Sequence, residues 1–279
     1  MKMIFNLTLI CLFTVFGSCL VSAQDSTAAK NQQRSTAADS DLLQIAVQKI
    51  CPVSGQDLGT MGEPIKVQVG EQTVFLCCQG CQSKQIKSEH WQTIQTRQAK
   101  AQGICPIMEK EVDASMQATT VAGYPIFVCC PPCIPKIQAA PEKSLEMVRA
   151  SYVAFVKAER QAASEQWHIK AQGICPVSGE VLGTKGQPVK VEVGEGEHAF
   201  LCCQGCVGKP IDAKHWGQVQ TNLAKAQKIC PVMEEPVDAS MESVVVNGRK
   251  IFVCCPPCIA KIQADPETYI DKLNAQIAK

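Results

Sequence analysis

The chain has 279 residues, including 27 Lys or Arg, 26 Asp or Glu, and 18 Cys. Basic and acidic residues therefore almost balance, and the chain lacks the excess of positive charge that nucleic-acid binding requires. We expect no nucleic-acid partner. So many cysteines indicate that sulfur chemistry carries the function.

The N-terminal segment, residues 1–23, predicts a cleaved export signal. It has a positively charged start, an apolar run from Ile4 to Phe16 and an end of small residues. A minority alternative is a lipoprotein acylated at Cys19, although the residues before it match a lipobox poorly. Residues 24–41, rich in Gln, Ser, Thr and Ala, predict a disordered linker. We expect an exported protein, periplasmic or extracellular, with no transmembrane segment after signal cleavage.

Sixteen cysteines recur in a fourfold pattern, a Cys-Pro dipeptide followed by Cys-Cys-x-x-Cys. From Cys51 to Cys175 is 124 positions and from Cys105 to Cys230 is 125, so one half of the chain is a duplicate of the other. The four sets are Cys51, Cys77, Cys78 and Cys81; Cys105, Cys129, Cys130 and Cys133; Cys175, Cys202, Cys203 and Cys206; and Cys230, Cys254, Cys255 and Cys258.

The repeats are of two types, which alternate along the chain. Type A modules read CPVSG and later CCQGC, whereas type B modules read CPIME or CPVME and later CCPPC. All four begin on the phrase Gln-x-Ile-Cys. The predicted boundaries are 42–98 for module A1, 99–141 for B1, 142–168 for a helical spacer, 169–223 for A2 and 224–279 for B2.

Within a module, the local patterns predict a hairpin followed by a helix. Residues 66–69 alternate like a half-buried strand that returns from Val74. Near the C-terminus, Asn247-Gly248 lies between two apolar β-branched runs, which is typical of a type I′ hairpin. Asp265-Pro266 predicts the start of a further helix. The sequence therefore predicts an α+β fold with each double cysteine between a strand and a helix.

This placement predicts that three thiols of a module converge. Cys77 and Cys81 lie four residues apart, on one face of a helical turn, and Cys51 approaches from the turn before the hairpin. The adjacent Cys78 is a fourth ligand, a bridge to another module or a small buried hydrophobe. The corresponding positions in the other modules carry the same alternatives.

Two further residue types are candidate ligands. Met108 and Met233 follow the first cysteine of each type B module by three residues, and a thioether there would favour Cu(I), although filling the core is the commoner role of a single Met. His90 and His215 recur nine residues after the last cysteine of each type A module. A histidine ligand is one reading there, and an exposed helical histidine is the commoner one.

The type B modules resemble the YHS domain, a small module related to the TRASH metal-binding domains. The resemblance rests on CPVMEEPVDASM, VVVNGRKIFVCCPPC and ADPETY between Cys230 and Tyr269, and on a similar order from Cys105 to Glu142. It implies that Cys129 with Cys133, and Cys254 with Cys258, are metal ligands. The family's turn cysteine is replaced here by Met in type B and by Ser54 or Ser178 in type A. Type A modules resemble the family more weakly.

Two other functions compete with metal binding. The Cys-x-x-Cys motifs resemble the redox pairs of thioredoxin-like enzymes, which makes thiol-disulfide exchange the second choice. Sixteen exported thiols could also form eight disulfides in a structural or interaction protein. Neighbouring cysteines are poor disulfide partners, however, and the i, i+4 spacing suits an ion.

We therefore expect an exported α+β protein of four small treble-clef-like modules that binds zinc or copper(I) through cysteine. Its expected role is to buffer, deliver or sense the metal, with a metal-transport or membrane protein as a candidate partner and no catalysis of its own.

Overall fold

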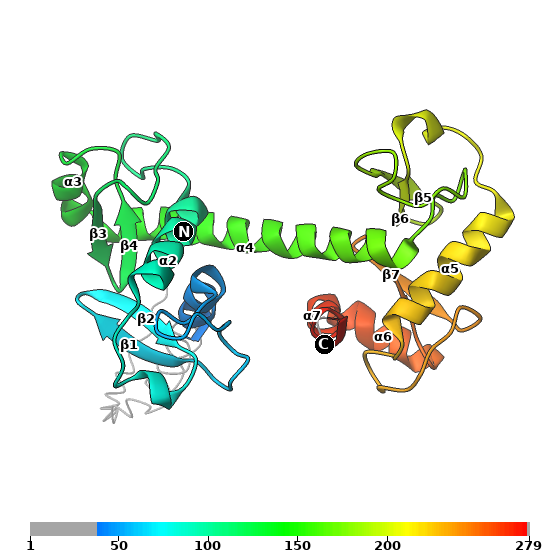
Figure 1. The fold of residues 1–279 in the computed structure, drawn as a ribbon, viewed down its shortest axis with the longest axis horizontal. Coiled ribbons are helices and arrows are strands. Elements are labelled where there is room, and N and C mark those ends of the chain that lie inside the picture. Colours follow the sequence, from blue (N-terminus) through cyan, green and yellow to red (C-terminus); the bar gives the residue numbers. More distant parts are fainter. Residues whose placement is uncertain (1–37, 278–279) are drawn as a thin grey trace, which may run out of the picture. The chain divides into compact units, whose positions relative to one another are not determined.

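The computed structural model describes residues 38–277, so the predicted export signal and most of the predicted linker lie outside the described residues. The chain divides into two compact units, one ending at Val153 and the other beginning at Ala154. Helices alternate with two-stranded antiparallel sheets in both units, which confirms the α+β class (Figure 1). No described helix is long and apolar enough to cross a membrane.

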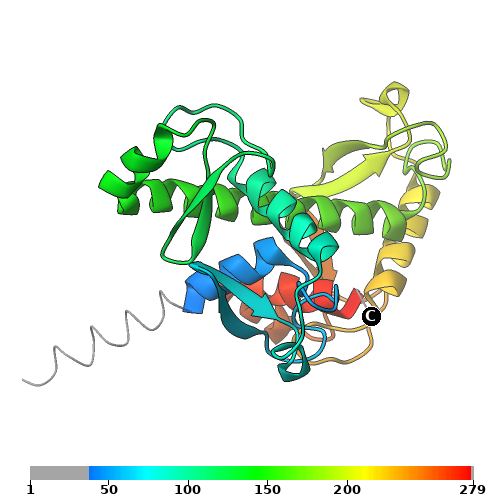
Figure 2. The ribbon, with the colours of Figure 1, turned by 60° about the vertical axis from the view of Figure 1, so that its left-hand side comes forward.

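The first unit contains modules A1 and B1. Its elements are a helix at residues 38–48, β1 (Ile65–Val69), β2 (Gln72–Leu76), the 3-10 turn η1 (Gln79–Cys81), α2 (Ser88–Gln102), β3 (Ala118–Val121), β4 (Tyr124–Phe127), α3 (Cys133–Ala139) and the first part of α4 (Pro141–Gln172). The helix at 38–48 begins inside the stretch expected to be a disordered linker, because Lys66 pairs with Asp41 and Gln48 binds β2. Figure 2 shows this helix, in blue, beside the β1–β2 hairpin.

The second unit repeats this order. It contains the rest of α4, β5 (Val189–Val193), β6 (Glu197–Leu201), the 3-10 turn η2 (Gln204–Cys206), α5 (Ala213–Gln227), β7 (Ser243–Val246), β8 (Arg249–Phe252), α6 (Pro256–Ala264) and α7 (Pro266–Ile277). The predicted β7–β8 turn is confirmed, since Asn247 and Gly248 both have positive φ, 51° and 79°. The predicted start of α7 is confirmed as well, because Asp265 Oδ1 accepts from the Thr268 N–H at 3.4 Å.

A buried glutamine joins a helix to a hairpin in every module. In module A1, the Gln48 side-chain amide donates to the Phe75 carbonyl at 2.6 Å, and its oxygen accepts from the Phe75 N–H at 2.8 Å. These two bonds satisfy both backbone groups of a buried strand residue, which would otherwise cost about 1–3 kcal/mol each. The equivalent pairs are Gln102 with Phe127, Gln172 with Phe200, and Gln227 with Phe252.

The chain turns sharply directly after each of these glutamines. In module B2, the Ile229 N–H donates to the Gln227 carbonyl at 2.9 Å across Lys228, which has φ 68° and ψ −53°. This is a classic γ-turn, a strained conformation that glycine adopts most easily. Gly103 and Gly173 occupy the same place in the middle modules, whereas Lys49 occupies it in the first. The turn directs the chain toward the first cysteine of the module.

Within each unit a strand of the type A hairpin contacts the turn of the type B hairpin. The Thr73 N–H donates to the Gly123 carbonyl at 2.9 Å, and in the second unit the His198 N–H donates to the Gly248 carbonyl at 2.7 Å. A Cβ on Gly123 would overlap the Thr73 side chain, and one on Gly248 would overlap the His198 ring. The two glycines therefore serve the close approach of the hairpins as well as the turn.

The long helix α4 covers the predicted spacer and extends beyond it at both ends. Its beginning buries Leu145, Val148 and Tyr152 in the first unit, where the Tyr152 and Tyr124 rings lie 5.9 Å apart. Its end buries His168 in the second unit, with its ring 5.3 Å from that of Phe200. The beginning of α4 therefore belongs to the core of the first unit and its end to the core of the second, so α4 is more than a spacer.

The segment after the double cysteine differs between the module types. In type B modules a helix begins within that motif, as predicted, at Cys133 in α3 and at Pro256 in α6. In type A modules only one 3-10 turn follows, and the next helix begins at Ser88 or Ala213. The prediction of a helix directly after every motif is therefore wrong for type A. In module A2 the cause is visible in Gly208, with φ 77°, followed closely by Pro210.

Candidate metal centres

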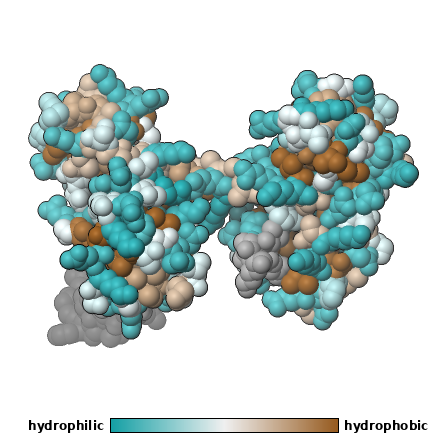
Figure 3. All heavy atoms as spheres, in the orientation of Figure 1, coloured by the Kyte–Doolittle hydropathy of each residue, from teal (hydrophilic) through white to brown (hydrophobic). Residues whose placement is uncertain are grey.

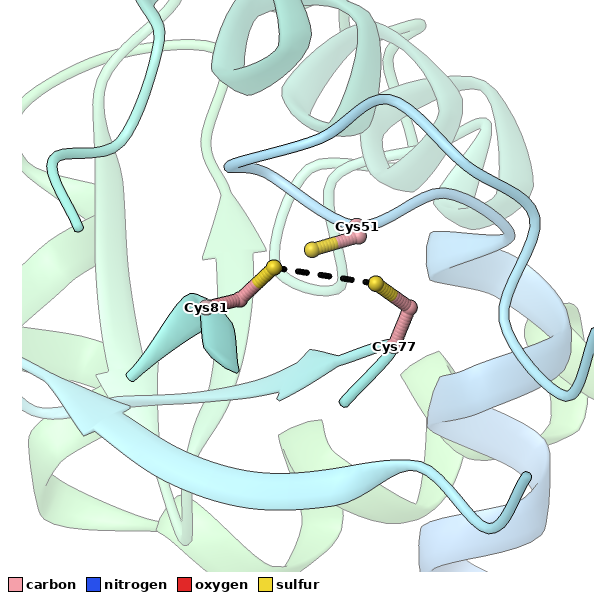
Figure 4. A group of neighbouring side chains, drawn as sticks. All are labelled: Cys51, Cys77 and Cys81. Atoms are coloured by element: carbon pink, nitrogen blue, oxygen red, sulfur yellow. Dashed lines mark hydrogen bonds between the residues drawn. The ribbon is translucent and has the colours of Figure 1, made fainter. Parts of the chain in front are cut away.

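Three sulfurs converge in every module, as the spacing predicted. In module A1, Cys51 comes from the turn before the hairpin, Cys77 from the end of β2, and Cys81 from η1, and their side chains point toward one another (Figure 4). The sulfur atoms of each group lie within 4.8 Å of one another. The four groups in the described chain are Cys51, Cys77 and Cys81; Cys105, Cys129 and Cys133; Cys175, Cys202 and Cys206; and Cys230, Cys254 and Cys258.

The sulfur separations suit a shared ion better than a covalent bond. The Sγ atoms of Cys77 and Cys81 lie 3.7 Å apart, and those of Cys254 and Cys258 lie 4.0 Å apart. A disulfide requires about 2.05 Å. Two thiolates bound to one tetrahedral zinc at about 2.3 Å lie about 3.8 Å apart. All sixteen described cysteines are free thiols, so the sulfur groups are not disulfide staples in this structure.

The pKa of the first cysteine of each group is lowered from its ordinary value. Burial raises the pKa of Cys51, but the backbone N–H groups of Ser54 and Cys77 and the Ser54 hydroxyl outweigh burial and lower that pKa to about 6. The pKa of Cys175 is also lowered to about 6, against the effect of burial, by the Ser178 hydroxyl and backbone N–H groups. Each type A module thus holds a thiolate at neutral pH in a site built by its Cys-Pro turn.

The last cysteine of each group keeps its proton. Burial, together with hydrogen bonds to Cys77 and Cys51, raises the pKa of Cys81 to about 12. Burial and the neighbouring thiols likewise raise the pKa of Cys133 to about 12 and that of Cys206 to about 11. A metal ion can bind first to the thiolate. The neighbouring neutral thiols then lose their protons as they bind the ion, which completes the set of three sulfur ligands.

The second member of each Cys-Cys pair lies beside the group without completing it. The Cys78 sulfur is 3.9 Å from those of both Cys77 and Cys81, yet it does not come within 4.8 Å of all three. Cys130, Cys203 and Cys255 hold the same place, and all four are half-buried. Cys78, Cys203 and Cys255 also pack against the apolar core of their modules. The position therefore suits both a fourth ligand and a partly buried hydrophobe.

The other candidate ligands are the two methionines of type B and the two histidines of type A. Met108 and Met233 are 47% and 54% exposed, so filling the core is not their role. His90 and His215 pack against the turn glycines Gly55 and Gly179, and neither belongs to a sulfur group. The interpretation of these histidines as ligands gains no support from the geometry.

Sequence reasoning missed a contact made by the type A serines. The Ser54 hydroxyl lies within hydrogen-bond distance of the Cys77 sulfur, at 3.2 Å, and its oxygen accepts from the Gln56 N–H at 3.2 Å. Ser178 repeats the arrangement with Cys202 at 3.4 Å and Glu180 at 3.4 Å. The signal was present, because the sequence has Ser in CPVSG where type B has Met.

On the face drawn in Figure 3, the surface of each unit is mainly hydrophilic with separate apolar patches. Comparisons with family models, curated proteins and solved structures gave no match. The function is therefore inferred from the geometry of the sulfur groups alone.

Proposed function

We propose that this protein is an exported metal-binding protein that holds one soft or borderline ion in each of its four sulfur groups. The observation that carries the proposal is the convergence of three cysteine sulfurs within 4.8 Å in every module. Thiolates are the ligands preferred by Zn(II) and Cu(I). The order of motifs in the type B modules, which resembles that of YHS and TRASH domains, supports the same role.

The two ions use the available atoms differently. Zn(II) in closed protein sites takes four ligands, and the half-buried second cysteine of each pair is the nearest further thiol. Cu(I) accepts thioethers as well as thiolates. Met108 and Met233 would therefore favour copper at the type B sites. We assign zinc or copper(I) to the sites on this basis.

The proposed role is to buffer, deliver or sense the metal outside the cytoplasm. The export signal expected over residues 1–23 supports that location. A metal-transport or membrane protein is the kind of partner that would receive the ion. Catalysis is not part of the proposal.

Metal analysis of the protein spanning residues 24–279, purified without oxygen, tests this function. We expect zinc or copper to copurify and most cysteines to react with a thiol reagent only after a chelator is added. A protein that carries no metal and shows eight disulfides would replace metal binding with the structural alternative.

A further inference from the structure

The four sulfur groups differ in how well the protein covers them. In type A modules all three cysteines are buried, and the second of them, Cys77 or Cys202, is only 2% or 0% exposed. In type B modules the first and third cysteines are buried, but the second, Cys129 or Cys254, is half-buried. The same position is therefore closed in both type A modules and open in both type B modules.

The serine contact adds to this difference. The hydroxyls of Ser54 and Ser178 lie 3.2 and 3.4 Å from the second sulfur of their own group, where each can donate a hydrogen bond to a metal-bound thiolate and hold it in place. In type B the corresponding residues, Met108 and Met233, have no hydroxyl, and their side chains are about half exposed. The second sulfur of a type B group is thus both reachable from solvent and unsupported by this hydrogen bond.

We propose that the type B modules exchange metal with external thiols while the type A modules retain it. The inference rests on the proposed function. An incoming thiolate forms a sulfur–metal bond at the open side, and the bond from Cys129 or Cys254 to the ion breaks. The released sulfur takes up the proton that the incoming thiol lost, and the oxidation state of the ion does not change. The acceptor is a thiolate of a small molecule or of a partner protein.

The test is the rate at which the zinc-loaded protein, residues 24–279, gives up its metal. The loaded protein is mixed with excess pyridylazo-resorcinol, a coloured zinc chelator, and increasing concentrations of glutathione as the thiol. We expect two phases of equal amplitude, separated by about tenfold or more in rate, which is the usual effect of losing a contact that supports a metal ligand. Glutathione should accelerate the fast phase.

Alkylation of the wild-type protein assigns the phases without any substitution. Thiols released during the reaction are trapped with iodoacetamide and located by mass spectrometry. Cys129 and Cys254 should be modified during the fast phase, and Cys77 and Cys202 during the slow phase. The reverse order would overturn the inference.

Paired Ser→Ala substitutions test the hydrogen bond itself. Ser54→Ala with Ser178→Ala should speed the slow phase by about tenfold. Ser115→Ala with Ser240→Ala is the matched control, because these hydroxyls donate to Asp113 and Asp238 and contact no sulfur. The control should leave both phases unchanged.

The outcomes separate the two claims. A protein that binds four zinc ions and releases all of them in one phase keeps the proposed function and overturns this inference. An unchanged slow phase in the Ser54→Ala, Ser178→Ala protein also overturns it. A protein that binds no zinc overturns both.

Discussion

At the scale of single residues, the chemistry depends on which side chain follows each first cysteine by three positions. Type A modules have a serine that binds sulfur, and type B modules have an exposed methionine. The convergence of Cys51, Cys77 and Cys81 could be predicted from the motif spacing, although a 3-10 turn after an extended Cys78, and not the expected helical turn, brings Cys81 to Cys77. The half-buried state of Cys129 could not, since it depends on how neighbouring segments cover the site.

The exposed methionines lead to a prediction about metal preference. Replacing Met108 and Met233 with Ser should weaken Cu(I) binding at the type B sites and leave Zn(II) binding nearly unchanged, because a thioether is a soft ligand and zinc rarely uses it. Competition titrations with a Cu(I) chelator and a Zn(II) chelator measure both affinities. Met61→Ser, which changes a methionine 63% exposed in a type A module, is the control. Equal losses for both metals would contradict the copper assignment.

The buried histidine of the second unit leads to a prediction about pH. Burial, aided by the nearby charge of Arg249, lowers the pKa of His168 to about 4 from 6.5. Between these values the unfolded chain binds a proton that the folded chain does not, so stability falls as the pH falls from 6.5 toward 4. The loss at pH 5 relative to pH 7 should be about 2 kcal/mol.

Urea unfolding at pH 7 and pH 5 measures this loss, with His168→Phe as the comparison because it keeps an aromatic ring beside Phe200. The variant should lose about 2 kcal/mol less than the wild type between the two pH values. The difference between pH values is the quantity to compare, since other groups titrate in both proteins. An identical pH dependence would show that His168 is not the group responsible.

At the scale of elements, every module contains the same series of features: a buried glutamine, a γ-turn, a Cys-Pro turn and a hairpin. Hairpins such as β7–β8 could be predicted from local patterns, because the positive φ of Asn247 and Gly248 is a short-range property. The γ-turn could not. The turn position holds Lys49 and Lys228 in the outer modules and Gly103 and Gly173 in the middle ones, so no single residue type marks it in the sequence.

The γ-turn predicts that a substitution can stabilise the protein. Lys228→Gly should raise the free energy of unfolding by about 1 kcal/mol, because glycine removes the strain of a positive φ in a residue with a Cβ. Lys225→Gly is the matched control, since Lys225 is exposed three residues earlier in helix α5. It should lower stability by about 1 kcal/mol. Denaturant unfolding measures both variants. A gain of stability in Lys228→Gly with a loss in Lys225→Gly would support the strained γ-turn, and a loss in both would contradict it.

We expect the Cys-x-x-Cys motifs to be poor catalysts of thiol-disulfide exchange. The sulfurs of Cys130 and Cys133 lie 3.4 Å apart where a short hairpin leads into α3, and Cys133 belongs to a candidate metal site. We expect insulin reduction to proceed only at the background rate of an exposed dithiol. Turnover comparable with that of a thioredoxin, lost on changing Cys130 and Cys133 to Ser, would favour the oxidoreductase alternative.

At the scale of the whole molecule, duplication explains why the two units contain the same contacts. The hairpin contact of Thr73 with Gly123 recurs as His198 with Gly248. The sequence predicted the duplication because both copies lie in one chain. It predicted α4 as a spacer, but it could not show that Tyr152 and His168 enter the cores of different units, because that depends on long-range packing.

Each module is small and has a modest core, so we expect metal binding and folding to be coupled across the chain. Anaerobic titration of the reduced protein, residues 24–279, with Cd(II) as a thiophilic substitute for zinc measures both together. Ultraviolet absorption follows the formation of sulfur–metal bonds, and circular dichroism follows folding. The account predicts saturation at four equivalents, with a gain of structure as each group fills. A chain that is fully folded without metal, keeps sixteen free thiols and shows no sulfur–metal absorption would contradict it.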